Sequence, residues 1–391
     1  MKGKRATIAT LFLITAAASA ATAFAESIPY EFTTVDILVP GSSTRSFPED
    51  INDDGVILTN VRINNLSEAV IADPLGHKNT KFKMSTFSCT GLPFADTSAS
   101  SINDKGQIVG SCSDAPSAPS REFGFVRRRN GDHILLAFPG ADHTLAFGIS
   151  NSNEVVGHYY NPLILGQSGL FRIHGFLWDG EKYSTIDFPL PNTYTMLWSI
   201  NTSGQILGEY TTFDPTTNET LAHNWFVYEN GNFILDFPES LEHIGGPAIS
   251  LADISDNGQI VGQRSNGGPD WNGFFLYESG TFYDIEFPAG WLSIDVRGLN
   301  NQGQFVGMYA ISVGIDPFGI NEVHGYIATP TPQKKPGKMH IAPAISLSLS
   351  ESQSSGSTVS TGSKPLDPYR DLIRRRHSEK HFEFLKSVAA R

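Results

Sequence analysis

One stretch of nine residues decides the fold: Ile102–Gly110, which reads INDKGQIVG. An aliphatic residue is followed by Asn, two variable residues, Gly, another variable residue, two aliphatic residues and a second Gly. The Asn side chain can accept hydrogen bonds from nearby backbone amides, and the first Gly supplies the positive φ of a tight turn. Because the aliphatic pair after the turn is typical of a buried strand, the stretch predicts a turn that leads into a strand.

The same pattern recurs along the chain, and we number its copies as repeat units 1 to 6. The copies begin at Ile51, Ile102, Ile149, Ile200, Ile254 and Leu299. Ser replaces Asn in units 3 and 5. The spacings are 51, 47, 51, 54 and 45 residues. Their mean of about 50 residues matches the length of one blade of a β-propeller.

The segments between the copies complete a blade-like unit. In unit 3 a strand at Gly175–Trp178 is followed by a turn at Asp179–Gly180 and by a second strand, Tyr183–Phe188, which ends at Pro189. Equivalent segments occur in four of the five intervals, and a degraded version runs from Ala69 to Pro93. Pro ends a strand readily because it has no N–H to donate.

The last strand of unit 6 is missing from the C-terminal side, and a matching strand lies at the N-terminus. This strand, Phe32–Val39 followed by Pro40, resembles Tyr183–Phe188 and its Pro189. We therefore predict an all-β fold, a single six-bladed β-propeller over 26–328 that the N-terminal strand closes by completing the last blade. An open β-solenoid of six repeats is the alternative, but it leaves the N-terminal strand unexplained.

The repeats resemble a known family. The repeated motif, the His-Gly-Phe at His174–Phe176 and the His-Gly-Tyr at His324–Tyr326 are similar to those of bacterial extracellular repeat proteins of the HAF type, as is Pro139–Ala141 with Thr144. This chain departs from the family pattern in two ways. Units 2, 4 and 5 lack the His, and Gly140 stands in place of the middle Ala. The resemblance implies secretion and a β-repeat fold, and it carries no activity that could be transferred.

The two ends of the chain differ from the repeats. Residues 1–25 have a basic start, an apolar run and an Ala23-Phe24-Ala25 cleavage motif, which together predict a signal peptide and a secreted or periplasmic protein. We expect no integral membrane segment after its cleavage. Residues 329–366 are rich in Pro and Ser and predict a flexible linker, and 367–391 form a basic tail that is either a short helix or a segment without fixed structure.

Composition and charge limit the function classes. Apolar residues make up 40% and charged residues 17%, which excludes a disordered or coiled-coil protein. Residues 26–328 hold 14 Lys and Arg against 35 Asp and Glu, a net charge of −21 that repels nucleic acid. This charge suits cationic or neutral partners, or it serves solubility alone. We expect a monomer that binds no nucleic acid.

The chain has only two cysteines, Cys89 and Cys112. In an oxidising compartment they are a candidate disulfide, and a loop of this size would contribute about 3 kcal/mol to stability. The alternative is two unpaired cysteines packed as small apolar residues.

Metal and acid–base chemistry have candidates but no complete motif. Ile51–Gly55 and Asp253–Gly258 resemble part of a calcium loop, but both lack the later bidentate Glu. Five histidines raise the same question: His143, His174, His223, His243 and His324. His174 and His324 occupy equivalent repeat positions, which indicates a structural role. We therefore predict no metal and no cofactor, and catalytic residues remain unknown.

Breaks in the repeat are the places where function is expected, because variable loops on a rigid scaffold carry binding residues. The candidate ligand-binding residues are Trp271, Trp291, Asp295, Arg297 and His243. Packing between blades is the alternative role for the aromatic ones. Our leading hypothesis is a non-catalytic binding or scaffold propeller that presents loops to an extracellular glycan or protein. The alternative is a channel-centred lyase or hydrolase acting on a polysaccharide or another extracellular substrate.

Overall fold

The structure is a computed structural model, and it describes residues 25–36, 47–63, 66–72, 97–113, 121–161, 173–217, 219–234, 248–265, 273–312 and 321–331. These residues form strands and turns, and no helix occurs among them. Accordingly, the described residues contain no helix long and apolar enough to cross a membrane. The predicted signal peptide up to residue 24, most of the linker and the whole basic tail lie outside the described residues.

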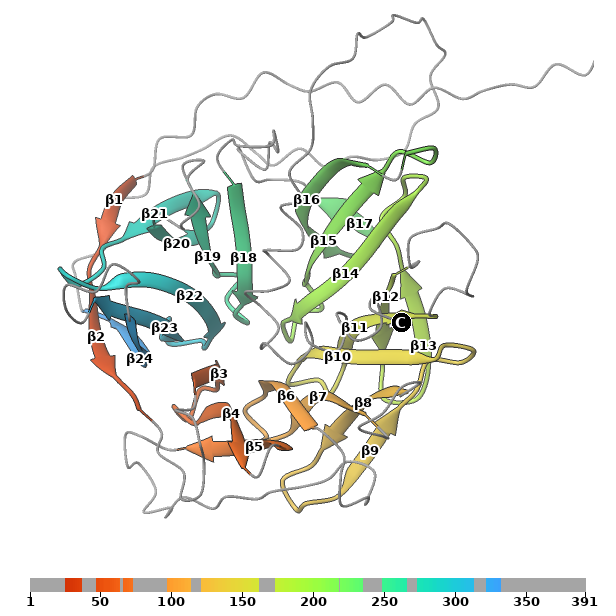
Figure 1. Cartoon of the computed structure of the whole chain (residues 1–391), viewed down its shortest axis with the longest axis horizontal. Helices are drawn as coiled ribbons and strands as arrows, with labels where there is room; N and C mark the ends of the chain where they lie inside the picture. The colour runs from red at the N-terminus through yellow and green to blue at the C-terminus, as the bar shows by residue number, and fades with distance from the viewer. Residues whose placement is uncertain are drawn as a thin grey trace, which may run out of the picture.

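The strands form a ring around a central axis (Figure 1). Units 1 and 2 contribute β3 (Phe47–Ile51), β4 (Ile57–Ile63), β5 (Leu66–Ala72), β6 (Thr97–Ile102), β7 (Ile108–Ser113), β8 (Glu122–Arg127) and β9 (His133–Leu136). Units 3 and 4 contribute β10 (His143–Ile149), β11 (Val155–Tyr160), β12 (His174–Trp178), β13 (Tyr183–Ile186), β14 (Thr193–Ile200), β15 (Ile206–Phe213), β16 (Thr220–Glu229) and β17 (Asn232–Ile234).

Units 5 and 6 include the two strands from the N-terminus. Unit 5 contributes β18 (Ala248–Ile254), β19 (Ile260–Ser265), β20 (Gly273–Glu278) and β21 (Thr281–Ile285), with β1 (Ala25–Ile28) parallel to β21. Unit 6 contributes β22 (Leu292–Leu299), β23 (Phe305–Ser312) and β24 (Asn321–Pro330). The N-terminal strand β2 (Tyr30–Thr34) pairs antiparallel with β24.

Hydrogen bonding joins the described strands into five sheets, four of which have four strands or more. The all-β propeller fold is thus confirmed, but a division into six separate sheets is not found. One parallel bridge between Glu122 on β8 and His143 on β10 joins units 2 and 3 into one eight-stranded sheet. The sheet of unit 1 has three strands among the described residues.

The last strand, β24, continues to Pro330. Thr331 extends the contact beyond the strand, since both its backbone N–H and its hydroxyl donate to the carbonyl of Pro29, at 3.1 and 3.0 Å. These two bonds attach Thr331 to the N-terminal segment, although the composition of this stretch favours a linker.

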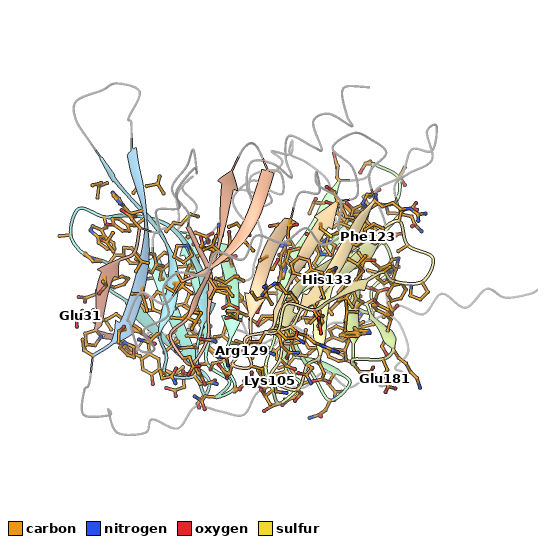
Figure 2. The ribbon with its side chains drawn as sticks, turned by 90° about the horizontal axis from the view of Figure 1, so that it is seen from below. Glu31, Lys105, Phe123, Arg129, His133 and Glu181 are labelled. Atoms are coloured by element: carbon orange, nitrogen blue, oxygen red, sulfur yellow. The ribbon has the colours of Figure 1, made fainter. Side chains whose placement is uncertain are left out.

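The motif turns lie at one face of the ring, which we call the turn face. Figure 2 shows Lys105, from the turn of unit 2, at this face with Glu181, whereas Phe123 lies toward the opposite face. In unit 2 the Asn103 Oδ1 accepts the backbone N–H of Gln107 at 2.9 Å, and Gly106 has a φ of 70°. The other units repeat this cap with Asn or Ser, as the sequence predicts.

The second Gly of the motif lies opposite an aromatic residue on the next strand. Gly157 pairs with Phe176, and a Cβ on Gly157 would lie 1.9 Å from the carbonyl oxygen of Leu145 and 2.9 Å from the Phe176 ring. The same pairing occurs in units 2, 4, 5 and 6. Unit 1 has neither partner, because Thr59 pairs there with Val70. The Gly is therefore required for close packing of the inner strand and the aromatic ring.

The apolar core lies between neighbouring units. In one cluster Leu58 of unit 1 packs with Ile102, Ile108 and Phe125 of unit 2, all at most 5% exposed. Five further clusters repeat this arrangement around the ring. Because each cluster takes side chains from two units, the sheets stabilise one another and hold the axis in place.

Candidate functional site

The six motif turns enclose a small cavity on the axis. Its volume is about 60 Å³, which is enough for a few water molecules. Residues of all six units line it, including five aspartates: Asp50, Asp53, Asp104, Asp253 and Asp256. No Lys, Arg or His lines this cavity. Within the described part of the chain, no group of three or more His, Cys, Asp or Glu side chains is arranged to hold a metal ion.

In units 1, 2, 4 and 6 the motif Asn links its turn to the next unit. Asn52 Nδ2 donates to the carbonyl of Asn103 at 3.3 Å, and Asn103 Nδ2 donates to that of Ser150 at 3.0 Å. Asn201 donates to Ser255 at 3.0 Å. Asn300 of unit 6 donates to Asn52 of unit 1 at 3.1 Å. Units 3 and 5 have Ser at this position, whose hydroxyl caps its own turn instead.

A second ring of hydrogen bonds runs one residue further along the turns. The N–H of Asp53 donates to Asp104 Oδ1 at 2.7 Å, and the N–H of Asp104 donates to Asn151 Oδ1 at 2.9 Å. Comparable bonds join Thr202 to Asp256, Asp256 to Asn301 and Asn301 to Asp53, at 2.6 to 2.7 Å. Asn151 Nδ2 also reaches Asp256 of unit 5, at 3.2 Å. These bonds therefore connect all six repeat units to one another.

Two aspartates lie just before the aliphatic residue of their motif. Asp50 accepts the N–H groups of Ile51 and Ile102, at 2.7 and 2.8 Å. Asp253 accepts the N–H of Leu299 at 2.7 Å and the hydroxyl of Ser199. Burial, and then the negative charge of Asp253, raise the pKa of Asp50 well above its usual value. Asp50 thus bonds unit 1 to the backbone of unit 2, and Asp253 bonds unit 5 to the backbone of unit 6.

Asp104 and Asp256 also have shifted pKa values, in opposite directions. Burial raises the pKa of Asp104. Burial acts in the same direction on Asp256, but hydrogen bonds from Thr202, Asn301 and Asn151 outweigh it and hold the pKa of Asp256 below its usual value. Each of the five aspartates accepts at least two hydrogen bonds. The cavity is therefore lined by carboxylates that accept hydrogen bonds from neighbouring units.

A second level of side chains lies further from the turn face. Each inner strand has a β-bulge or irregularity two residues before the aliphatic residue of its motif. We call the residues at this position the bulge ring: Glu49, Ser100, Phe147, Trp198, Ala252 and Arg297. All six are partly exposed. A bulge re-aims a side chain, and the residue at this position differs in all six repeats.

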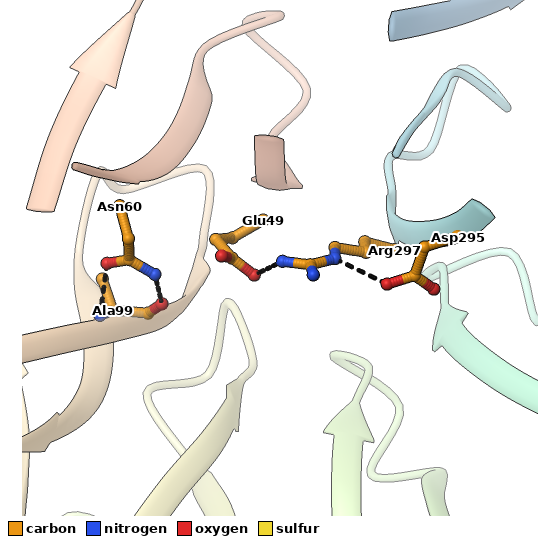
Figure 3. A network of polar contacts seen from close by, with 5 residues as sticks. All are labelled: Glu49, Asn60, Ala99, Asp295 and Arg297. Carbon is orange, nitrogen blue, oxygen red and sulfur yellow. Dashed lines mark hydrogen bonds and ion pairs between the residues drawn. The ribbon is translucent and has the colours of Figure 1, made fainter. Parts of the chain in front are cut away.

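Two of the predicted ligand residues, Asp295 and Arg297, come together at the bulge ring. Arg297 Nε donates to Asp295 Oδ2 at 2.9 Å, and its Nη1 donates to Glu49 of unit 1 (Figure 3). Burial opposes the charge of the guanidinium, but Glu49 and Asp295 together raise the pKa of Arg297. Beside this trio, Asn60 exchanges two 2.9 Å hydrogen bonds with the backbone of Ala99. These contacts join unit 6 to unit 1 and unit 1 to unit 2.

An aromatic group lies on units 3 and 4 at the same level. The Phe147 ring is 4.7 Å from the Trp198 ring and 5.0 Å from the His158 ring, between centroids. Phe147 belongs to none of the six apolar clusters that the described residues form. Sequence reasoning missed Phe147 and Trp198. Their shared position within the repeat, two residues before the aliphatic one, is the signal that could have found them.

The remaining predicted residues lie elsewhere or outside the described residues. Trp291 stacks on Tyr309 at 3.3 Å and packs against the core cluster between units 5 and 6, as the packing alternative expects. Cys112 is buried and disulfide-bonded. Trp271, His243 and Cys89 lie outside the described residues.

The described candidate histidines each contact a carboxylate from another segment of the chain rather than one another. His174 Nδ1 lies 2.6 Å from Asp187, and His324 Nδ1 lies 2.8 Å from Asp36. Both rings stack on a Tyr with centroids 5.2 Å apart. His143 and His223 contact Glu122 and Glu209, at 3.2 and 3.0 Å. The two equivalent histidines thus have the structural role that their repeat position indicates.

No known family model and no curated protein sequence matches this chain. Several solved β-propeller and enzyme structures are similar at low identity. The β-propeller domain of the Trilobed protease from Pyrococcus furiosus is 9% identical over 73% of this chain and 94% of its own, with a TM-score of 0.39. Virginiamycin B lyase from Staphylococcus aureus is 9% identical over 77% and 100%, with a TM-score of 0.39. A gluconolactonase from Xanthomonas campestris is 10% identical over 80% and 99%, with a TM-score of 0.35.

Proposed function

We propose that this chain is a secreted, non-catalytic binding or scaffold propeller that presents loops to an extracellular glycan or protein. One observation carries the proposal: all five aspartates of the axial cavity accept hydrogen bonds from turns or side chains of neighbouring units. Carboxylates used in this way hold a scaffold together. A rigid ring of this kind suits the display of variable loops.

The proposal includes a closed ring of six blades of about 50 residues each, with β2 completing the last one. Six motif turns with the same cap support this count. The bond from Asn300 to Asn52 and the pairing of β2 with β24 support closure. Secretion is supported by the signal-peptide pattern of residues 1–25 and by the resemblance to HAF-type extracellular repeat proteins.

A channel-centred lyase or hydrolase is the second candidate, and one observation favours it. Ionisable side chains from several units meet on the axis, and burial together with Asp253 raises the pKa of Asp50. Raised pKa values of buried carboxylates are typical of active sites as well as of structural networks. The two candidates therefore differ in whether these carboxylates touch a substrate.

Turnover and binding can be measured on the same glycan panel with the full chain. We expect glycan ligands to raise the melting temperature without releasing reducing ends or unsaturated sugars. A ligand at 100 times its Kd adds about 2.7 kcal/mol of stability, and EDTA should not change the result. Product formation that Asp50→Asn abolishes, in a variant that still folds, would instead establish the enzyme. Asp179→Asn, the same change at an exposed turn outside the cavity, is the matched control.

A further inference from the structure

Three tight turns among the described residues contain Asn followed directly by Gly, at Asn130, Asn230 and Asn257. In such a pair the backbone nitrogen of the Gly can attack the side-chain amide carbon of the Asn, because Gly has no side chain to hinder the approach. All three Asn side chains are exposed. Access to water therefore does not distinguish the three pairs, and their hydrogen bonds have to be compared.

The pair at Asn130 is held by hydrogen bonds within its own turn. Asn130 Nδ2 donates to Asp132 Oδ2 at 2.6 Å, and Asn130 Oδ1 accepts the backbone N–H of Asp132 at 3.1 Å. The N–H of Gly131, which would be the attacking group, donates to the carbonyl of Arg128 at 2.9 Å. Attack at Asn130 therefore requires several hydrogen bonds to break.

The pair at Asn257 is held by bonds within unit 5 and to unit 6. Asn257 Nδ2 donates to the carbonyl of Asn301 at 2.9 Å. The N–H of Gly258 donates to the carbonyl of Ser255, also at 2.9 Å. Both the amide that would be attacked and the nitrogen that would attack it are thus in use.

The pair at Asn230 is not held in this way. Within the described part of the chain, neither the Asn230 side chain nor the N–H of Gly231 makes a hydrogen bond. Their φ angles of 50° and 83° are those of a type I′ turn, which joins β16 to β17. β17 has only three residues and pairs with β16 alone among the described strands. A short edge strand opens locally at low free energy, so this turn can reach the geometry of attack most readily.

We propose that Asn230 is a site of spontaneous modification, at which its side-chain amide is lost and isoaspartate or aspartate is formed. The nitrogen of Gly231, having lost its proton to solvent, forms a bond to Cγ of Asn230. The Cγ–Nδ2 bond breaks, and Nδ2 leaves as ammonia. Water then opens the succinimide ring at either of its carbonyl groups, which yields isoaspartate or aspartate. The reaction needs no oxidant or reductant, and it is independent of the proposed function.

The isoaspartate product should weaken unit 4, because it inserts a methylene group into the backbone of the turn. The turn then no longer fits the pairing of Glu229 with Asn232. Phe233 on β17 packs against Phe188 and Phe226, with ring centroids 5.0 Å apart in both pairs. It covers the apolar cluster between units 3 and 4. Loosening of β17 should therefore expose this cluster and lower the melting temperature.

Peptide mapping by mass spectrometry, on the full chain incubated in mildly alkaline buffer, measures the conversion at each Asn. Each hydrogen bond that must break should slow the reaction by about two- to tenfold. We therefore expect Asn230 to react first, with Asn130 and Asn257 at least about tenfold slower. In denaturant the three should react at similar rates, because the bonds that distinguish them are lost.

Two variants test the role of these contacts. Asn230→Ser is the matched control, since Ser279 and Gly280 form the same kind of turn in unit 5, with φ angles of 52° and 83°. This variant should keep the initial melting temperature and abolish the fall that the incubated wild type shows. Asp132→Ala removes the acceptor of the Asn130 amide and should speed conversion at Asn130 by about two- to tenfold.

Three outcomes would overturn the proposal. The first is conversion at Asn130 or Asn257 ahead of Asn230 in the folded chain. The second is the same ratio of rates in the folded and the unfolded chain, which would show that local sequence sets the order. The third is an unchanged Asn230 in the folded chain after a time that converts the unfolded chain. Glycan binding measured before incubation reports on the proposed function separately.

Discussion

The hydrogen bonds between motif turns lead to a prediction for which the repeat supplies its own reference, because units 3 and 5 have Ser where the other units have Asn. Asn103→Ser keeps an oxygen that can cap the turn, as Ser150 does in unit 3. It removes the amide that donates to the carbonyl of Ser150 at 3.0 Å and to Gln107 Oε1 at 2.8 Å. At about 0.5–1.5 kcal/mol for each bond, the loss is about 1–3 kcal/mol. At roughly 2 °C per kcal/mol for a large domain, the melting temperature should fall by about 2–6 °C.

Scanning calorimetry of the variant and wild type measures this directly, provided that each unfolds in one transition. Asn103→Ala should cost about 1 kcal/mol more because it also removes the cap. Ser255→Asn is the reverse change, and its new amide should reach the carbonyl of Asn300 and add about 0.5–1.5 kcal/mol. If Asn103→Ser were as stable as wild type while Asn103→Ala was not, the amide bonds between units would contribute nothing and the reasoning would be wrong.

Three further perturbations test other parts of the molecule. Gly157→Ala places a Cβ 1.9 Å from a backbone oxygen, so chemical denaturation should show a loss of about 2 kcal/mol or more, and a neutral result would contradict the packing role of this Gly. Arg297→Met leaves two carboxylates, each at most 22% exposed, without their shared partner. It should cost about 3–5 kcal/mol, which adding Glu49→Gln should partly restore. The pKa of Asp50 is raised on folding, so its protonation favours the folded state. Its contribution is full below pH 3.8 and is lost as the pH rises through the raised pKa, and Asp50→Asn should flatten this part of the curve of unfolding free energy against pH.

The repeat motif made much of the fold predictable, because its constraints are local. An Asn or Ser that caps its own turn and a Gly with positive φ are determined by neighbours within a few residues, and they recur as the spacing indicates. The aliphatic runs after the turns form strands as predicted, such as β7 and β11. The pairing of β2 with β24 was also anticipated, because Phe32 to Asp36 repeats the pattern of another strand in the chain.

The candidate site was only partly predictable. Asp295 and Arg297 were selected for their residue type, but their partner Glu49 is 248 positions away from Arg297. Phe147 and Trp198 carry no motif, and their equivalent positions become recognisable only through the bulges that pairing between strands creates. The joining of units 2 and 3 through Glu122 and His143 likewise depends on a contact between units.

The amino-acid sequence alone establishes the all-β class, the repeat and the residues that cap each turn, since these depend on hydrogen bonds and φ angles within nine residues. The meeting of five aspartates in one cavity arises only when the strands form a ring. Ring formation brings equivalent positions of all the units to one axis. Their side chains then act together, although about 50 residues separate each from the next.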